Sequence, residues 1–385
     1  MTGPDGPRTC AVTLRSLDGP FARELFVHVA PPSGGSSEEQ AQLVYRELAS
    51  VLADHGGGPG HTVRQTVLCR DVSSDARVAL HARRAVARQR GGADWAGAVM
   101  DVQQPPLDSG AALEVLLHAV LSNGNETPGG TTRDDGPPSA QRRVGPDERL
   151  YLGNIVGDGA TAADQTASMF ERAERQLQAA GFTFSDVART WLYLRDIDAD
   201  YLALNAARRA FFQSRNLSVA PASTGIAGGH AVPASKIAMA LYAVRGPGGP
   251  GRTVMTSPTL NEAPSYGADF VRGMRVDEGN RTALHVSGTA SVDENGATVH
   301  QGDIVRQAER MLVNIKSLLA GQGAETRHIV SATTYVKHAK DADLLRACFA
   351  QAGFTGFPNP LVAAPVCRAD LLCETELLAL LPASS

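Results

Sequence analysis

An internal repeat constrains the fold of this chain more than any other feature of its sequence. Three segments share one order of elements: a short apolar strand, a polar loop, an amphipathic helix, an alternating strand, a second helix and a last apolar strand. Glycine commonly follows the end of a helix, and the first helix of each segment is followed by one, at Gly56, Gly181 and Gly321. The chain is therefore predicted to contain three copies of one β-α-β-α-β unit.

The predicted elements can be given for each copy from hydrophobic periodicity. Copy one has a strand at 25–30, a helix from Ser36 or Ser37 with Glu39 or Gln40 completing a capping box, a strand at 62–70, a helix at 78–88 and a strand at 113–120. Copy two has the strand RLYLGNIVGDG, a helix at 164–180 capped by Asp164, the strand VARTWLYLRD, a helix at 201–213 and a strand at 236–244. Copy three has the strand LHVSGTASV, a helix with an apolar stripe from Ile304 to Leu319, the strand SATTYVKH, a helix at 341–350 and a strand at 372–380.

A common register supports the repeat. The middle strand of each copy ends on a basic residue, at Arg70, Arg195 and Lys337. The matching position on the last strand is Glu114, Ala238 and Glu374. The spacing between these two registers agrees within one residue in copies one and two and is shorter in copy three. Copy one is the weakest match to the pattern.

Two segments rich in glycine, proline and serine separate the copies, at 122–146 and 246–268, and this composition opposes regular structure. The tip of the first is expected to be disordered. The predicted domains are a degenerate unit over 1–121, a second unit over 147–245 and a third over 269–385. Each unit covers only one face of its sheet with helices, so three units can cover one another around a pseudo-threefold axis in an α+β fold.

Composition and motifs exclude several classes of function. Acidic residues number 40 and basic residues 36, without a basic stripe, which argues against a nucleic-acid partner. No apolar run is long enough for a membrane span, and the polar amino terminus lacks the apolar core of a signal peptide. The five cysteines include no CxxC pair, and the histidines form no HExxH motif. We therefore expect a cytoplasmic protein without a metal or another cofactor.

The repeated unit resembles the RidA (YjgF) family. The similarity lies in SGTAS at the start of copy three, in the VxxxTxYVK-like strand and in CETELLAL, which looks like the EIEA ending of that family. RidA proteins are single units of a chorismate-mutase-like fold that form trimers and hydrolyse imines at sites between subunits. The resemblance places their carboxylate-holding arginine near Leu361, which is not basic.

The tandem arrangement resembles the chorismatases over roughly residues 90–380. The motifs are RLYLGNIVGDG, APASTGIAGG, SPTLNEAPSYGADFVRG and CRADLLCETE. The resemblance implies an enzyme that cleaves the enol-pyruvyl ether of chorismate and releases pyruvate with a ring acid, in secondary metabolism. Such a lyase or hydrolase must protonate the methylene carbon of its substrate, which requires a general acid that is protonated near neutral pH.

Glu374 is the candidate acid. It lies on an otherwise apolar strand, and copy two has Ala238 at the same register, so the fold itself does not require a carboxyl group there. Glu376 follows on the same face of the strand. The alternative is that both are solvated charges that protect a strand edge. Glu114 has the same register in the degenerate copy, where a structural role is favoured.

The dianionic substrate also needs basic partners. Arg208, in LNAARRAFF, is the first candidate, with Lys337 and Arg149 behind it. The alternatives are a solvated helix charge for Arg208, a structural role at the shared basic register for Lys337 and a linker charge for Arg149.

Tyr335 can point a hydroxyl group into the site or belong to the core. Cys367 resembles the residue that steers chorismatases towards 3-hydroxybenzoate rather than 3,4-dihydroxycyclohexa-1,5-diene-carboxylate, whereas Ala290 does not decide the product. Cys367 can equally be a small core residue. Two other functions stay open: RidA-like imine or enamine hydrolysis, and non-catalytic binding of a small ligand.

Internal closure of the three copies predicts that the protein is a monomer, because the chain itself supplies the partners that a homotrimer would provide. Sedimentation velocity at micromolar concentration is expected to give a single species of 40.4 kDa. A stable homotrimer would count against this arrangement.

Overall fold

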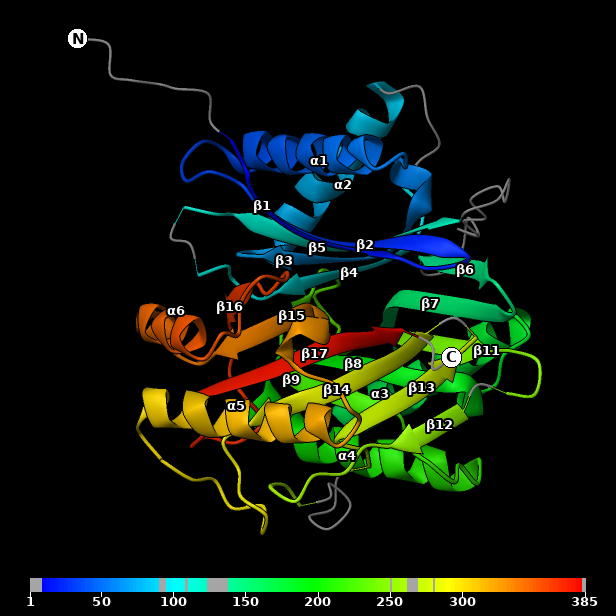
Figure 1. Ribbon diagram of the computed structural model, residues 1–385, viewed down its shortest axis with the longest axis vertical. Helices are drawn as coiled ribbons and strands as arrows, with labels where there is room; N and C mark the ends of the chain where they lie inside the picture. Colours follow the sequence, from blue (N-terminus) through cyan, green and yellow to red (C-terminus); the bar gives the residue numbers. More distant parts are fainter. Residues whose placement is uncertain are drawn as a thin grey trace.

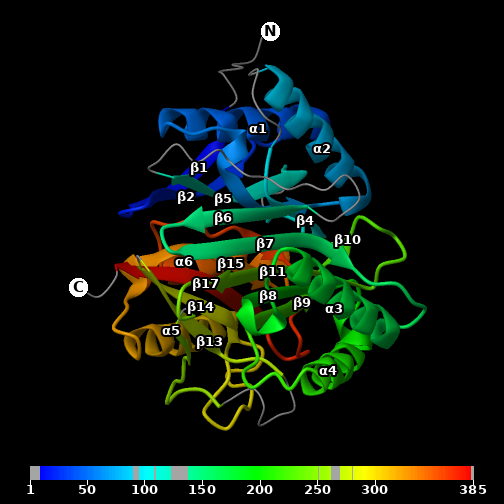
Figure 2. The same ribbon diagram turned by 90° about the vertical axis from the view of Figure 1, so that its right-hand side faces the viewer.

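The computed structural model describes residues 9–89, 95–107, 110–122, 138–249, 251–261, 269–279 and 281–382. Three sheets face a common centre, and each carries its own pair of helices on its outer side (Figures 1 and 2). This is the predicted α+β pseudo-trimer of repeated units within one chain. Among the described residues, no helix is long and apolar enough to cross a membrane.

Each sheet is built mainly from one copy. Copy one contributes β1 (Ala11–Asp18), β2 (Ala22–Ala30), α1 (Ser37–Asp54), β3 (Thr62–Cys69), α2 (Val72–Gln89), β4 (Ala98–Gln103) and β5 (Leu113–Ser122). Copy two contributes β6 (Ser139–Val144), β7 (Asp147–Val156), α3 (Ala162–Ala179), β8 (Val187–Leu194), α4 (Ile197–Ser214), β9 (Ala222–Ala227), β10 (Gly229–His230) and β11 (Ile237–Arg245). Copy three contributes β12 (Gly251–Val254), β13 (Gly273–Glu278), β14 (Arg281–Ala290), α5 (Ile304–Ala320), β15 (Ile329–Val336), α6 (Ala342–Gln351), β16 (Leu361–Ala363) and β17 (Cys373–Pro382).

The strand orders show the repeat directly. They are β1-β2-β5-β3-β4-β10, β6-β7-β11-β8-β9 and β12-β13-β14-β17-β15-β16. The last long strand of each copy (β5, β11 or β17) lies between its first long strand (β2, β7 or β14) and its middle strand (β3, β8 or β15). It therefore runs through the centre of its copy. The short strand β10 of copy two pairs with β4 and joins the first sheet, which links these copies through the backbone.

The predicted register is confirmed by strand pairing. The matching cross-strand pairs are Leu68 with Glu114, Tyr193 with Ala238 and Tyr335 with Glu374. The basic residue after each middle strand makes the same kind of contact in all three copies. Its side chain donates a hydrogen bond to a backbone carbonyl in the segment before the last strand. These bonds run from Arg70 Nε to Ala111 (2.8 Å), from Arg195 Nε to Ser235 (3.0 Å) and from Lys337 Nζ to Ala369.

The structure corrects three details of the sequence reading. A strand parallel to the middle strand follows the second helix in every copy (β4, β9 and β16), where no strand was predicted. Edge strands β6 and β12 occupy parts of the two predicted linkers, since edge strands tolerate their polar and glycine-rich sequences. Helix α3 begins after Thr161, whose hydroxyl accepts from the Asp164 N–H, so Asp164 is the third residue of a capping box and not the cap. The tip of the first linker, at 123–137, lies outside the described residues.

A buried ionic cluster joins all three copies. Arg149 of copy two donates from Nη1 to Glu24 of copy one (2.9 Å) and from Nη2 to Glu278 of copy three (2.6 Å). Arg281 of copy three contacts the same two glutamates, at 2.8 Å from its Nε to Glu278. Arg149 is fully buried, so its ion pairs are shielded from water. The adjacent arginines lower the pKa of both Glu24 and Glu278, despite the opposing effect of burial.

Replacement of Arg149 by methionine is expected to lower the free energy of unfolding by about 3–5 kcal/mol, because Glu24 and Glu278 remain buried with one cation fewer. Arg143→Met is the control: this exposed arginine pairs with Glu148 at 3.0 Å, and its loss should cost at most about 1 kcal/mol. Urea denaturation of both variants measures the difference. Equal stability of the two would contradict a structural role for the cluster.

Candidate active site

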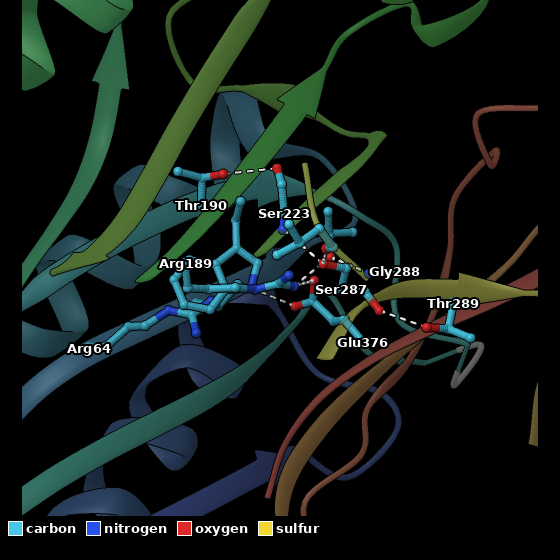
Figure 3. A network of polar contacts seen from close by, with 12 residues as sticks. Arg64, Arg189, Thr190, Ser223, Ser287, Gly288, Thr289 and Glu376 are labelled. Atoms are coloured by element: carbon cyan, nitrogen blue, oxygen red, sulfur yellow. Dashed lines mark hydrogen bonds and ion pairs between the residues drawn. The ribbon is translucent and has the colours of Figure 1, made fainter. Parts of the chain in front are cut away.

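Copies two and three meet edge to edge beside Glu374. The hydroxyl of Ser287 accepts from the backbone N–H of Ser223 at 2.9 Å, and the hydroxyl of Thr224 accepts from the backbone N–H of Gly288 at 2.9 Å. Strand β14 is irregular at this point, since its pairing with β17 shifts between Val286 and Thr289. This bulge directs the backbone of copy three against strand β9 of copy two (Figure 3).

Glu374 lies under this bulge, between two residues predicted for the site. Ala290 faces it from β14, and Tyr335 faces it from β15. A Cβ atom at Gly288 would overlap Oε1 of Glu374, so only glycine permits this close approach. Glu374 is 5% exposed, and its carboxyl group receives no hydrogen bond or ion pair from the residues that the structure describes.

Burial therefore dominates the acidity of Glu374. Desolvation, with a smaller contribution from the nearby charge of Glu376, raises its pKa to about 8, against the opposing influence of Arg272, Arg189 and Arg368. Most molecules then carry a neutral carboxylic acid at this position at pH 7. That is the protonation state which a general acid requires.

The charges of Arg272, Arg189 and Arg368 act on this acid, and Arg208 lies at the Ser223 side of the same interface. Arg208 of helix α4 is 2% exposed; its Nη2 donates to Asn205 at 2.7 Å and its Nη1 to Ser223 at 3.5 Å. Arg272 is also buried and donates to the backbone and side chain of Asn261, each at 2.8 Å. The Phe270 ring lies between them, 5.8 Å from each guanidinium carbon.

Cys367 and Arg368 occupy the loop that leads into β17. The Cys367 thiol lies close enough to Glu374, Arg368 and Arg272 to interact with their charges, and Tyr201 of helix α4 hydrogen-bonds to it. Burial raises the pKa of Cys367 to about 12, so the thiol stays protonated and is not a nucleophile. The Lys337 bond to Ala369 anchors this same loop.

Glu376 has a different environment, although it is only two residues from Glu374. Its Oε2 accepts from Arg189 Nη2 at 2.8 Å, and its Oε1 accepts from Trp191 Nε1 at 2.8 Å (Figure 3). Arg189 Nη2 also donates to the hydroxyl of Thr224, which links this ion pair to the backbone of Gly288. Glu376 is thus a partnered carboxylate that holds copies two and three together.

The structure brings together most of the residues singled out from the sequence. Ala290, Tyr335 and Cys367 adjoin Glu374, and Arg208 reaches the Ser223 side of the same interface. Lys337 does not adjoin Glu374, and its side chain instead holds the loop of Cys367 and Arg368 through the bond to Ala369. Arg149 belongs to the ionic cluster instead, where it contacts Glu24 and Glu278.

Arg272 and Arg368 were missed as individual residues. Both lie in motifs that had been noticed, SPTLNEAPSYGADFVRG and CRADLLCETE, and each arginine follows an apolar or small residue that faces the interior. Their proximity to Glu374 depends on the packing of two loops, which sequence periodicity does not report.

The position that corresponds to the carboxylate-holding arginine of RidA proteins has no basic residue in any of the three copies. Leu361 pairs with Thr334, and the positions with the same register are Gly225 in copy two, paired with Leu192, and Asp101 in copy one, paired with Val67. The interface that contains Glu374 is formed with copy two, so Gly225 is the relevant position. The Tyr201 ring packs over it, 3.0 Å from where a Cβ atom would lie.

Opposite changes in stability are expected for the two glutamates. The pKa of Glu374 is about 8 in the folded state, against 4.5 for an ordinary glutamate, so its contribution to stability is lost as the pH rises from about 4.5 to about 8. Glu374→Gln should therefore be more stable than the wild type at pH 8, by on the order of a few kcal/mol, with little difference at pH 4.5. Glu376→Gln should melt at a lower temperature, because it weakens the partner of buried Arg189. Thermal melts at several pH values test both, and a destabilised Glu374→Gln would contradict the assignment.

Comparisons with known proteins place the chain in a family. Residues 149–245 and 261–376 match the family described as Endoribonuclease L-PSP. Protein DfrA of Myxococcus xanthus is 32% identical over 98 residues, which cover 26% of this chain and 72% of that protein. The 3-hydroxybenzoate synthase of Streptomyces hygroscopicus is 29% identical over 246 residues, covering 54% of this chain and 66% of that enzyme, just under two thirds of its length.

A solved structure shows the same fold over most of the chain. The crystal structure of a chorismatase superposes with a TM-score of 0.59 and 18% identity, covering 83% of this chain and 93% of that one. The resemblance to the chorismatases drawn from the motifs is thereby confirmed in architecture. The chain belongs to the Endoribonuclease L-PSP family, with its units in the tandem arrangement that a chorismatase also has.

Proposed function

We propose that this protein is a chorismatase, which cleaves the enol-pyruvyl ether of chorismate and releases pyruvate. The observation that carries the proposal is Glu374: a buried carboxylic acid, protonated at neutral pH, that has no hydrogen bond or ion pair among the described residues and lies at an interface that also contains Arg208, Arg272 and Arg368. The matches to a 3-hydroxybenzoate synthase and to the fold of a chorismatase support it.

The first chemical step is carbon protonation. Glu374 gives its proton to the methylene carbon of the enol ether, a C–H bond forms, and the electron pair of the double bond is consumed. The product is an oxocarbenium ion, whose positive charge is stabilised by the carboxylate that Glu374 has become. The raised pKa of Glu374 makes this proton available near neutral pH, and a positioned acid of this kind contributes roughly 10²–10⁴-fold to a rate.

The arginines supply the binding energy for the dianion. Arg208 and Arg272 are held by Asn205 and Asn261, so their guanidinium groups are oriented before substrate arrives. Arg368 lies beside Glu374 in the loop anchored by Lys337. Two carboxylates on the substrate match this set, because guanidinium groups recognise carboxylates with paired hydrogen bonds.

The fate of the oxocarbenium ion determines the ring product. Attack by a ring hydroxyl of the substrate keeps the reaction free of water and leads to 3-hydroxybenzoate and pyruvate, whose atoms sum to those of chorismate. Attack by water leads instead to the dihydroxycyclohexadiene acid and pyruvate. Cys367 is a protonated, partly buried thiol next to Glu374, so it acts by shape and polarity. We assign the product as 3-hydroxybenzoate on the resemblance of Cys367 to the residue found in that type of chorismatase.

Imine hydrolysis of the RidA type has less support. It needs an arginine at the register of Leu361, and the residue supplied to this interface is Gly225. Cationic groups are present nearby, but they come from helix α4 and from two loops rather than from this strand. A purely non-catalytic binding role does not account for a carboxylic acid whose burial costs stability.

Incubation with chorismate should release pyruvate, measured by NADH loss with lactate dehydrogenase. Glu374→Gln should lower kcat by roughly 10²–10⁴-fold, because the amide cannot donate a proton to carbon. Glu309→Gln, an exposed glutamate of α5, is the matched control and should retain full activity. For the wild type, kcat/KM should be level below pH 8 and fall about tenfold per unit above it, as Glu374 ionises.

An absence of pyruvate, or equal release by wild type and Glu374→Gln, would refute the proposal. Chromatography against 3-hydroxybenzoate and the diene-diol identifies the ring product. If the diene-diol is the main product, the assignment of a steering role to Cys367 is wrong while the assignment of the acid stands.

A further inference from the structure

A cavity lies at the centre of the molecule, where the three sheets meet. It has a volume of about 70 Å³, and its lining includes Phe26 of copy one, Tyr151 and Trp191 of copy two, and His285 of copy three. Glu376 lines it, but Glu374 does not. The chemistry assigned to Glu374 therefore leaves this cavity without a role.

Polar groups in the cavity wall lack partners. Arg189 is 2% exposed and donates from Nη2 to Glu376 and Thr224, but its Nη1 atom is buried and donates no hydrogen bond to any described residue. The same is true of Nε of Arg64 and of Nε2 of His285. A buried donor without an acceptor is costly in a folded protein, and a bound acceptor would remove that cost.

The charges of the wall favour an anion. Arg281 is balanced by Glu24 and Glu278 in the ionic cluster, and Arg189 is balanced by Glu376. Arg64 pairs with no carboxylate among the described residues; its guanidinium carbon stacks 3.5 Å above the centre of the Trp191 ring and its Nη2 donates to Thr66 at 3.3 Å. Among the described residues, the positive charge of Arg64 therefore remains unbalanced at the cavity wall.

The other walls favour a flat, apolar body. Four aromatic side chains line the cavity, from Phe26, Tyr151, Trp191 and Tyr242. Since one buried water needs roughly 10–15 Å³ by the same measure, the enclosed part of the cavity has room for about five waters, and a ring compound would also occupy its open side. Its partly exposed lining residues belong to copies one and three, among them Leu116, Ser331 and Leu378, so a ligand can enter between these copies.

We propose that this axial cavity is a second binding site, and that it takes a small aromatic monocarboxylate. The carboxylate lies between Arg64 and the free nitrogen of Arg189, and the ring lies among the aromatic side chains. Binding there requires no turnover, so the site is independent of the reaction assigned to Glu374.

Benzoate is the probe, and Trp191 reports its binding. The sequence has two tryptophans, and Trp95 lies apart from the cavity in the helix-side core of copy one, so Trp95→Phe leaves a single reporter. Benzoate should change the fluorescence of Trp191 in a saturable way. Benzamide, which has the same shape without the charge, should bind at least about tenfold more weakly.

Two variants locate the binding. Arg64→Met should weaken benzoate binding at least about tenfold, and Ser331→Phe, at the partly exposed edge of the cavity, should abolish it. Arg272→Met, beside Glu374, should leave it unchanged. A lack of saturable change up to about 10 mM benzoate, or loss of binding in Arg272→Met but not in Arg64→Met, overturns the proposal. Because chorismate is absent from this experiment, its outcome does not depend on whether the protein cleaves chorismate.

Discussion

The ionic cluster of Glu24, Arg149, Glu278 and Arg281 is the constraint on which the rest of the structure depends. It takes one or more charges from each copy and places them where water is excluded. A buried cluster of this kind tolerates few alternative arrangements, since any displaced charge would be left unpaired. The copies are thereby fixed in one relative orientation. The interface that buries Glu374 and the axial cavity both follow from that orientation.

The three interfaces have diverged from the symmetry of the fold. At the register of Glu374, copy one has Glu114, which hydrogen-bonds to His28 at 2.8 Å, and copy two has Ala238. At the bulge that corresponds to Gly288, copy two has Asn154, which exchanges two hydrogen bonds with Asp101, at 2.9 and 3.0 Å. The interface between copies two and three instead combines a glycine with an acid that has no hydrogen bond among the described residues. At the corresponding positions of the other copies, Glu114 and Asn154 have hydrogen-bond partners.

Glu374 and Glu376 show how partners decide the role of a side chain. They share a strand, a face and a residue type, and both are nearly fully buried. Arg189 and Trp191 hydrogen-bond to Glu376, whereas no described residue hydrogen-bonds to the carboxyl group of Glu374, which lies against Gly288. One is consequently a structural ion pair and the other a protonated acid. Copy two produces this difference, since it supplies Arg189 and Trp191 to Glu376 and no described hydrogen-bond donor to Glu374.

The sequence by itself determined the repeat, the strand and helix order, the common register and the position of Glu374 on the last strand, because these depend on local periodicity and on spacing. Its motifs also indicated Ala290, Tyr335, Cys367 and Arg208 as candidate site residues. It did not distinguish Arg149 and Lys337, which are structural, from Arg272 and Arg368, which adjoin the acid, because the partners of all four lie in other segments of the chain. Only the tertiary structure decided which cations face which carboxylates, because these contacts join segments from different copies. The unmatched donors of the axial cavity were invisible for the same reason, since a missing partner is a property of packing and not of any one stretch of chain.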